Sequence, residues 1–372
     1  MTKAVKNRPN LEILVGAAAQ RLVFDADKVA VGVRFAVRGA AGQDLADETV
    51  RLSTRGEVLL ASGAIGSPQL LMLSGVGPSA ELASHDIEVV AAREGVGANL
   101  QDHPACLVSH FGSEKAKGLS HSSKLRVPGT TLTSPKAALT WALKGEGPLT
   151  SPGCDHGGFV RVGGSSEDDA DAPNADDDGG ADVQFRFLAT KSITPDGMST
   201  ISGGYQAQKD HPDGITIQAI VARPKSRATL KLRSRDPHDA PLIEDYFFSD
   251  ARDVATMVAA LKKGREIMLQ PALSEFRGAE EFPGAAVQTD AQLAAYVRAT
   301  AHTANAIVGT CKMGRHDDAR AVVDSQLKVI GVHKVRVVDA SIMPSLPGGQ
   351  TAASTIAIAE KAADLLQLAS SR

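Results

Sequence analysis

Two strand–turn–helix segments, far apart in the chain, place the strongest constraint on its fold. In the first, an apolar strand from Glu57 to Ala61 leads through small residues into a helix that we expect to open at Ser67-Pro68. In the second, an alternating strand from Val335 to Asp339 leads through a Pro-Gly-Gly turn into a long apolar helix from Thr351. Such helix starts leave backbone N–H groups free, and these groups bind anionic parts of cofactors well.

Two further motifs lie between these segments, Gly-Val-Gly-Ala-Asn-Leu-Gln-Asp-His at 95–103 and Gly-Thr-Cys-Lys-Met-Gly at 309–314. With all four in this order, the chain resembles the glucose–methanol–choline (GMC) family of flavoenzymes. The resemblance implies an FAD cofactor. The positions that it assigns to cofactor binding are Ala19, Ser62, Gly63, Ala64, Asn99, Asp102, His103, Asn305, Asp339, Ala340, Gln350 and Thr351.

Composition excludes several classes of function. The 372 residues are 43% apolar and 22% charged, which is ordinary for a globular protein with a large core. A net charge of −3 gives no electrostatic reason to expect nucleic acid or an anionic membrane as a partner. No apolar run is long enough to cross a bilayer, and three scattered cysteines suggest neither disulfides nor a metal site. The resemblance implies a small-molecule substrate, a fatty acid or an alcohol, as the partner, and the oligomeric state stays open.

The start of the chain alternates with a period of two over 11–15, 21–24 and 29–35, which predicts a small antiparallel ribbon. In the GMC family this ribbon follows a dinucleotide-binding strand and a G-x-G-x-x-G loop. No such fingerprint precedes the ribbon here. We therefore expect the later two-thirds of a family member, without the first strands of the Rossmann unit.

The expected fold class is α/β, with an α+β substrate part. The FAD-binding domain is assembled from discontinuous segments, residues 1–105 and 292–372, and an antiparallel-sheet substrate domain spans 106–291. Within the substrate domain, 163–182 is rich in Asp, Ala and Gly and reads as a surface insertion. Periodicity predicts strands of a second sheet at 215–221 and 228–232, and helices at 136–144 and 250–268.

The position of the catalytic base is unusual. Alcohol-oxidising GMC enzymes carry a histidine three residues before the glycine that matches Gly309, and here that residue is Ala306. Its neighbour is Asn305, and the partner position on the Pro-Gly-Gly turn is Gln350. Neither alanine nor an amide accepts a proton at neutral pH, so general-base catalysis from these positions is not available.

Amides at these positions resemble one branch of the family, the algal fatty acid photodecarboxylases. The segments around Cys154 and Arg186 resemble the cysteine and arginine segments of that branch, and Gln218 matches a glutamine of its substrate site. The resemblance implies catalytic roles for Cys154, Arg186, Asn305 and Gln350. It implies substrate contacts from Cys154, Arg186, Gln218 and, as a substitute for a missing tyrosine, Tyr205.

These residue types suit a carboxylate substrate. A carboxylate that enters an apolar tunnel loses solvation, and the permanently charged guanidinium of Arg186 is a suitable partner for it. Cys154 carries a weak S–H group for positioning or hydrogen transfer. Asn305 and Gln350 can hydrogen-bond the flavin edge without titrating.

One departure leaves alternatives open: the photodecarboxylases have a tyrosine where this chain has Ile201, and Tyr205 lies four positions later. The second hypothesis is an FAD-dependent alcohol dehydrogenase or oxidase that uses His302 or water as its base. The third is an inactive fragment or interaction remnant. A complete algal protein would be chloroplastic, whereas this chain shows no targeting segment and is expected to be soluble.

Overall fold

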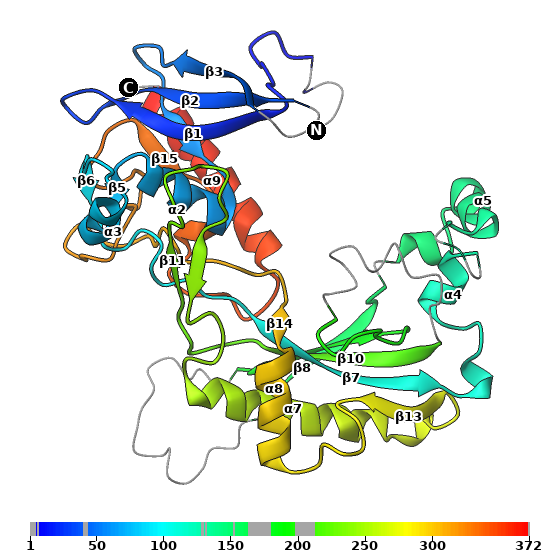
Figure 1. The fold of residues 1–372 in the computed structure, drawn as a ribbon. Coiled ribbons are helices and arrows are strands. Elements are labelled where there is room, and N and C mark those ends of the chain that lie inside the picture. Colours follow the sequence, from blue (N-terminus) through cyan, green and yellow to red (C-terminus); the bar gives the residue numbers. More distant parts are fainter. Residues whose placement is uncertain are drawn as a thin grey trace.

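A computed structural model describes residues 5, 7–39, 44–127, 130, 132–151, 153–162, 180–197 and 213–370. The chain forms two parts that lie side by side (Figure 1). One contains the N-terminal ribbon and the C-terminal helix, and the other contains a six-stranded sheet. None of the helices in the described ranges is both long and apolar enough to cross a membrane.

The first part is built from two sequence-distant regions. Strands β1, β2 and β3 form the antiparallel ribbon, while β4 and β15 pair in parallel, so that Val58 lies opposite Val335. The expected strand at 11–15 is exposed chain without strand structure, because no strand within the described ranges pairs with it. The elements are β1 (Ala17–Phe24), β2 (Ala30–Arg38), β3 (Asp44–Arg51), β4 (Val58–Leu60), α2 (Gly63–Leu73), β5 (Val76–Gly77), α3 (Ser79–Ser84), β6 (Ala91–Ala92), β11 (Thr229–Lys231), β12 (Leu242–Glu244), β15 (Val335–Val337), η6 (Ala340–Ile342) and α9 (Thr351–Ser370).

The second part is an antiparallel sheet in the order β13-β7-β10-β9-β8, and β14 pairs with β7. Helices α7 and α8 pack on the sheet (Figure 1), and Ile217 and Leu261 lie in the core between them. The elements are β7 (Pro104–Gly112), η1 (Glu114–Ala116), α4 (His121–Leu125), α5 (Pro135–Lys144), η2 (Pro148–Thr150), β8 (His156–Val160), β9 (Val183–Leu188), β10 (Gly214–Val221), α7 (Ala251–Met268), η5 (Pro271–Leu273), β13 (Arg277–Phe282), α8 (Asp290–Thr300) and β14 (His302–Thr303).

This sheet confirms the antiparallel substrate part that the sequence predicts. The predicted strand at 228–232 exists as β11, but it pairs with β12 and lies outside the sheet of β10. The domain boundaries stay predictions. Residues 163–179 of the predicted acidic insertion lie outside the described residues.

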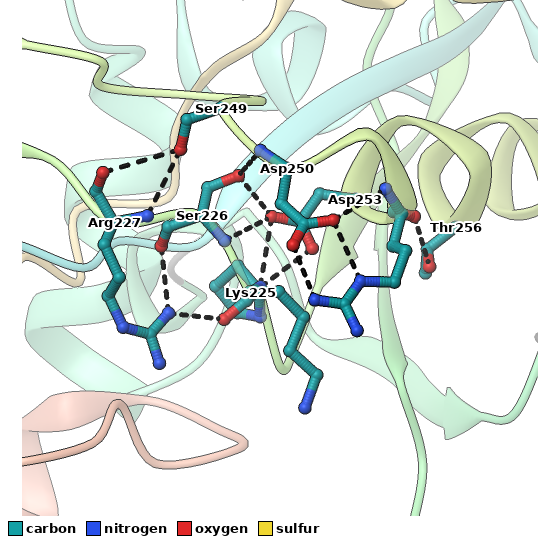
Figure 2. Close-up of polar contacts among 9 residues, drawn as sticks. Lys225, Ser226, Arg227, Ser249, Asp250, Asp253 and Thr256 are labelled. Atoms are coloured by element: carbon teal, nitrogen blue, oxygen red, sulfur yellow. Dashed lines mark hydrogen bonds and ion pairs between the residues drawn. The ribbon is translucent and has the colours of Figure 1, made fainter. Parts of the chain in front are cut away.

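A buried aspartate, Asp253, holds the loop between β10 and β11, where the chain passes from the second part to the first (Figure 2). Asp253, in the first turn of α7, accepts hydrogen bonds from the backbone N–H groups of Lys225 and Ser226 and from the Ser226 hydroxyl. Asp250 caps the same helix through the N–H of Arg252. The loop between β10 and β11 is therefore held by carboxylate acceptors at the start of α7.

Candidate functional site

The carboxyl ends of the parallel strands β4 and β15 meet at one edge of this pair, which brings the two strand–turn–helix segments together. Asp339, just after β15, accepts a hydrogen bond of 2.9 Å from the N–H of Gly63 and one of 2.5 Å from the hydroxyl of Ser67. Its other oxygen accepts from the N–H of Ser341. The buried carboxylate therefore joins the start of α2 to η6.

Helix α2 begins at Gly63, four residues earlier than the start predicted at Ser67. Pro68 consequently lies inside the helix, where it cannot donate to the carbonyl of Ala64. The hydroxyl of Thr310 donates to that carbonyl instead, at 2.7 Å. The Gly-Thr motif at 309–310 thus supplies the hydrogen bond that the proline removes.

The start of α2 has open space for part of FAD, although the Asp339 carboxylate already accepts the N–H of Gly63. Gly63 has a φ of +74°, and the space that a Cβ would take there is open. Ser62 is exposed, and the helix dipole favours negative charge in front of this turn. Ala340 begins η6 and Thr351 begins α9, and both are half-buried. Ala19 is exposed on β1 at a register irregularity, and its predicted cofactor contact stays a prediction.

Asp102 is the most densely bonded carboxylate in this region. One oxygen accepts from the N–H groups of His103, at 2.8 Å, and Ala306, at 2.9 Å. The other accepts from the hydroxyls of Thr303 and Tyr246. Burial and the Asp102 charge raise the pKa of the Tyr246 hydroxyl, which stays a donor. These contacts fix the segment 303–306, and a direct contact between Asp102 and the cofactor stays a prediction.

His103 connects the segments that carry the two predicted amides. Its backbone carbonyl accepts from the N–H of Ala304, next to Asn305. In its buried ring, Nδ1 is 2.9 Å from the carbonyl oxygen of Val221. Nε2 is 3.1 Å from the carbonyl oxygen of Pro347 and 3.2 Å from that of Gly349. The turn that leads to Gln350 is therefore fixed against the end of β10.

Asn305 and Gln350 are both exposed, and neither side-chain amide has a hydrogen-bond partner among the described residues. Asn305 adopts a left-handed conformation with a φ of 61°, which asparagine tolerates better than most residues. Asn99 instead uses its amide to donate to the carbonyls of Gly309 and Pro344. The open amides of Asn305 and Gln350 fit the polar edge of a flavin, whereas Asn99 supports the turn.

A cavity of about 380 Å³ lies on the sheet side of Asn305, and two of the predicted substrate residues, Arg186 and Gln218, line it; Cys154 is not among the lining residues. Arg186 on β9 donates from Nη1 to Oε1 of Gln218 on β10, at 3.3 Å, and the amide of Gln218 lies 2.9 Å from Nε2 of His302. The Nη2 atom of Arg186 is buried, with no hydrogen-bond partner in the described part of the chain. The apolar part of the lining comes from Leu107, Leu188, Ile193 and Ala304.

Burial controls the protonation of this cavity. It lowers the pKa of His302, so the neutral imidazole is favoured, with Nδ1 3.4 Å from the carbonyl of Thr300 and Nε2 free to accept from Gln218. Burial also raises the pKa of the Cys154 thiol, with Arg186 acting in the opposite direction. Cys154 precedes β8, where Gly157 pairs with Arg186. The cavity therefore offers a fixed cation, a neutral imidazole and a nearby protonated thiol.

The sequence alone did not predict three of these contacts. Lys191 also lines the cavity, buried in an ion pair with Glu281. The link from His302 to Gln218 and the bond from Tyr246 to Asp102 join residues that are far apart in sequence, so no local motif signals them. Tyr205 lies outside the described residues, and its predicted substrate contact stays a prediction.

Comparisons with known proteins agree with this geometry. Family models described as GMC oxidoreductase match residues 1–105 and 224–359. The chain is 40% identical over 98% of its length to the chloroplastic fatty acid photodecarboxylase of Chlamydomonas reinhardtii, covering 58% of that protein. It is 38% identical to an alcohol dehydrogenase of Pseudomonas putida and 41% identical to an oxygen-dependent choline dehydrogenase of Burkholderia cenocepacia. Each match covers 97% of this chain, and 59% and 57% of those proteins respectively.

Solved structures show the same fold. A formate oxidase superposes with a TM-score of 0.81 at 26% identity, over 98% of this chain and 62% of that one. Pyridoxine 4-oxidase from Mesorbium loti superposes with a TM-score of 0.72 at 22% identity, over 98% of this chain and 59% of that one. The chain thus spans less than two-thirds of the length of each of these proteins.

Proposed function

The chain belongs to the GMC oxidoreductase family, and from this premise we propose that the whole protein uses FAD and blue light to decarboxylate fatty carboxylates. FAD is the cofactor of this family, as the sequence predicts. The observation that carries the proposal is Arg186, whose buried Nη2 has no hydrogen-bond partner among the described residues and lies at a partly apolar cavity. A chloroplast location belongs to the same proposal, because the relative from Chlamydomonas is named for it.

The open Nη2 of Arg186 favours an anionic substrate group. A buried donor without an acceptor is costly, and a carboxylate can remove that cost with a charge-assisted hydrogen bond. Gln218 holds Nη1 and thereby fixes the plane of the guanidinium. The leucine and isoleucine side chains of the lining provide apolar surface for an alkyl chain.

The chemistry can be divided among this chain's residues. Bound FAD would supply, on excitation, the one-electron oxidation of the carboxylate. Loss of that electron would break the bond between the α-carbon and the carboxyl carbon, release CO2 and leave an alkyl radical, which would take back the electron that FAD had removed and gain one proton. Cys154 keeps its S–H at neutral pH because burial raises its pKa, so it is available as a donor. Asn305 and Gln350 would hold the cofactor edge through amides that do not titrate.

A second candidate is the oxidation of an alcohol, and one observation favours it. His302 is neutral and lines the same cavity, so it is the available imidazole for taking a hydroxyl proton. Its Nε2 already accepts from Gln218, however, and its lowered pKa makes it a weaker base. Similarity to an alcohol dehydrogenase and to a choline dehydrogenase also supports alcohol oxidation as the second candidate.

The test begins with the visible absorption spectrum of the 372-residue chain and of the longest product of its gene. A flavin band selects the form for assay with palmitate under blue light. We expect hydrocarbon and CO2 in light and none in the dark, with Arg186→Gln inactive and Arg186→Lys strongly impaired because lysine lacks the planar fork. Flavin bleaching in the dark by an alcohol, without a light-dependent product, would support the second candidate. Absence of flavin in both forms would support the inactive remnant.

A further inference from the structure

A lobe of the second part, residues 113–151, is locally basic although the whole chain is acidic. Between Glu114 and Glu146 there are six basic residues and no acidic residue. Lys115 is paired with Glu275 at 2.9 Å. The remaining exposed lysines are Lys117, Lys124, Lys136 and Lys144. Net charge over 372 residues gave no reason to expect an anionic surface as a partner, whereas this local distribution does.

The same lobe exposes large apolar side chains. Helix α5 buries only the small side chain of Ala137, while Leu139 and Leu143 are 60% and 74% exposed. These leucines are four positions apart and therefore share a helix face. Trp141, the only tryptophan of the chain, is 54% exposed on the same helix. A helix that turns its leucines outward among lysines is typical of attachment to a lipid surface.

The lobe is also connected to the cavity. The first residue of α4, His121, donates its backbone N–H to the carbonyl of Ala189 at 2.7 Å. Ala189 lies between Leu188 and Thr190, which both line the cavity. In Figure 1, α4 and α5 form the outer end of this side of the molecule, remote from α9. A surface that met the lobe would therefore be near the residues that line the cavity.

We propose that the α4–α5 lobe docks the protein on an anionic lipid bilayer, with Leu139 and Leu143 in the interface and the four exposed lysines at the headgroups; Trp141, two positions from each leucine, lies on the other side of α5. Of the possible occupants, a bilayer matches both the outward leucines and the excess of positive charge. A second copy of this chain would bring six more basic residues against the first six. The docking does not depend on the reaction that the protein catalyses.

The chain carries its own probe for this proposal, because all tryptophan emission comes from Trp141. Vesicles of phosphatidylcholine with phosphatidylglycerol should co-sediment with the protein, and brominated lipid should quench the emission in part, because the indole is one helix diameter from the inserted leucines. Pure phosphatidylcholine should bind much more weakly. Salt at about 1 M, where the Debye length is about 3 Å, should release the protein from the mixed vesicles.

Four lysine variants, one leucine pair and one control separate the contributions. Each of Lys117→Gln, Lys124→Gln, Lys136→Gln and Lys144→Gln should weaken binding about fivefold, since one lysine near the surface contributes about 1 kcal/mol. The pair Leu139→Ser and Leu143→Ser should abolish co-sedimentation with the mixed vesicles. The matched control, Lys361→Gln with Leu368→Ser on α9, changes an exposed lysine and an exposed leucine and should leave binding unchanged.

Three results would overturn the proposal. The first is a protein that does not co-sediment with anionic vesicles. The second is binding that the lobe variants weaken no more than the α9 control does. The third is a concentration-dependent dimer that the leucine pair abolishes, without vesicle binding, which would assign the face to a second copy. Light-driven activity does not enter any of these readouts, so the docking and the proposed function can fail separately.

Discussion

Replacement of Asp102 is the sharpest test of how the site is held together. Its carboxylate accepts from two buried backbone N–H groups, those of His103 and Ala306, and from the hydroxyls of Thr303 and Tyr246. Asp102→Leu is close in size and removes every acceptor. Each orphaned buried N–H costs about 1–3 kcal/mol, so the two together should cost about 2–6 kcal/mol of stability. The hydroxyls can rotate toward other acceptors and should add less.

Asp102→Asn provides the matched comparison. Its amide oxygen can face the two N–H groups while its NH2 group donates to the hydroxyl oxygens of Thr303 and Tyr246. The loss is then the difference between charge-assisted and neutral hydrogen bonds, about 1–3 kcal/mol. Tyr246→Phe removes one donor and should cost about as much as that single bond, about 1.5–3 kcal/mol at most.

The assay is thermal unfolding followed by circular dichroism, together with the visible spectrum of whichever form of the protein binds flavin. We expect the midpoint to fall more for Asp102→Leu than for Asp102→Asn. Flavin content should fall in the same order, because the carboxylate fixes the segment that carries Asn305. The reasoning is refuted if the leucine variant unfolds within about 1 kcal/mol of the wild type, since the N–H groups would then have other acceptors.

Three further results should follow from the same structure. Burial lowers the pKa of His302, so below about pH 6.5 the unfolded chain binds more protons than the folded one, and the free energy of unfolding decreases as the pH decreases. In melting curves, His302→Gln should reduce this pH dependence by at most about 1.4 kcal/mol per pH unit. Asp253→Ala leaves the N–H groups of Lys225 and Ser226 without an acceptor and should cost about 2–6 kcal/mol in thermal unfolding. Loss of the helix cap in Asp250→Ala should cost less, about 0.5–2 kcal/mol, and the reverse order would contradict the role of Asp253 in holding the loop between β10 and β11. Mass spectrometry at pH 7 should show that iodoacetamide modifies Cys154 more slowly than a free thiol and faster than the two fully buried cysteines; equal rates for all three would contradict its half-buried environment.

Local pattern was sufficient for much of the fold. Alternation predicted β10, and helical periodicity predicted α7 to within a residue of its observed span, Ala251–Met268. The family resemblance predicted the flavoenzyme fold, which the family match and the superposed structures confirm. These elements are predictable because their apolar residues face a core with the period of the element itself.

Prediction failed where a distant residue decides the local structure. The start of α2 was placed at Ser67, because proline normally opens a helix. Pro68 is accepted inside α2 because Thr310, more than two hundred positions away in sequence, bonds the carbonyl that the proline leaves open. Likewise, β11 was predicted in the same sheet as β10, which it follows in the chain. Ala228, just before β11, pairs with Leu100 instead, and β11 pairs with β12 in the first part.

Distant partners also redefine the candidate site. Sequence resemblance assigned Asp102 to the cofactor, and His302 was expected to be a hydrogen-bonded core or rim residue that could also serve as a reserve base. In the structure, protein donors fill both oxygens of Asp102, and His302 orients the amide of Gln218 that holds Arg186. Such roles depend on which side chains meet across β7, β10 and β14, and no motif in a single segment encodes that meeting.

Three buried aspartates share one physical role. Asp102, Asp253 and Asp339 each accept at least one backbone N–H and a serine, threonine or tyrosine hydroxyl from another segment. Chain segments that leave strand ends have N–H groups without a ladder partner, and a carboxylate satisfies several at once. None of the three is paired with a lysine or arginine in the described ranges, so salt has little charge pairing to screen at these positions. The support of the site should therefore persist at salt concentrations that release the α4–α5 lobe from lipid, and this difference separates the framework of the molecule from its proposed docking surface.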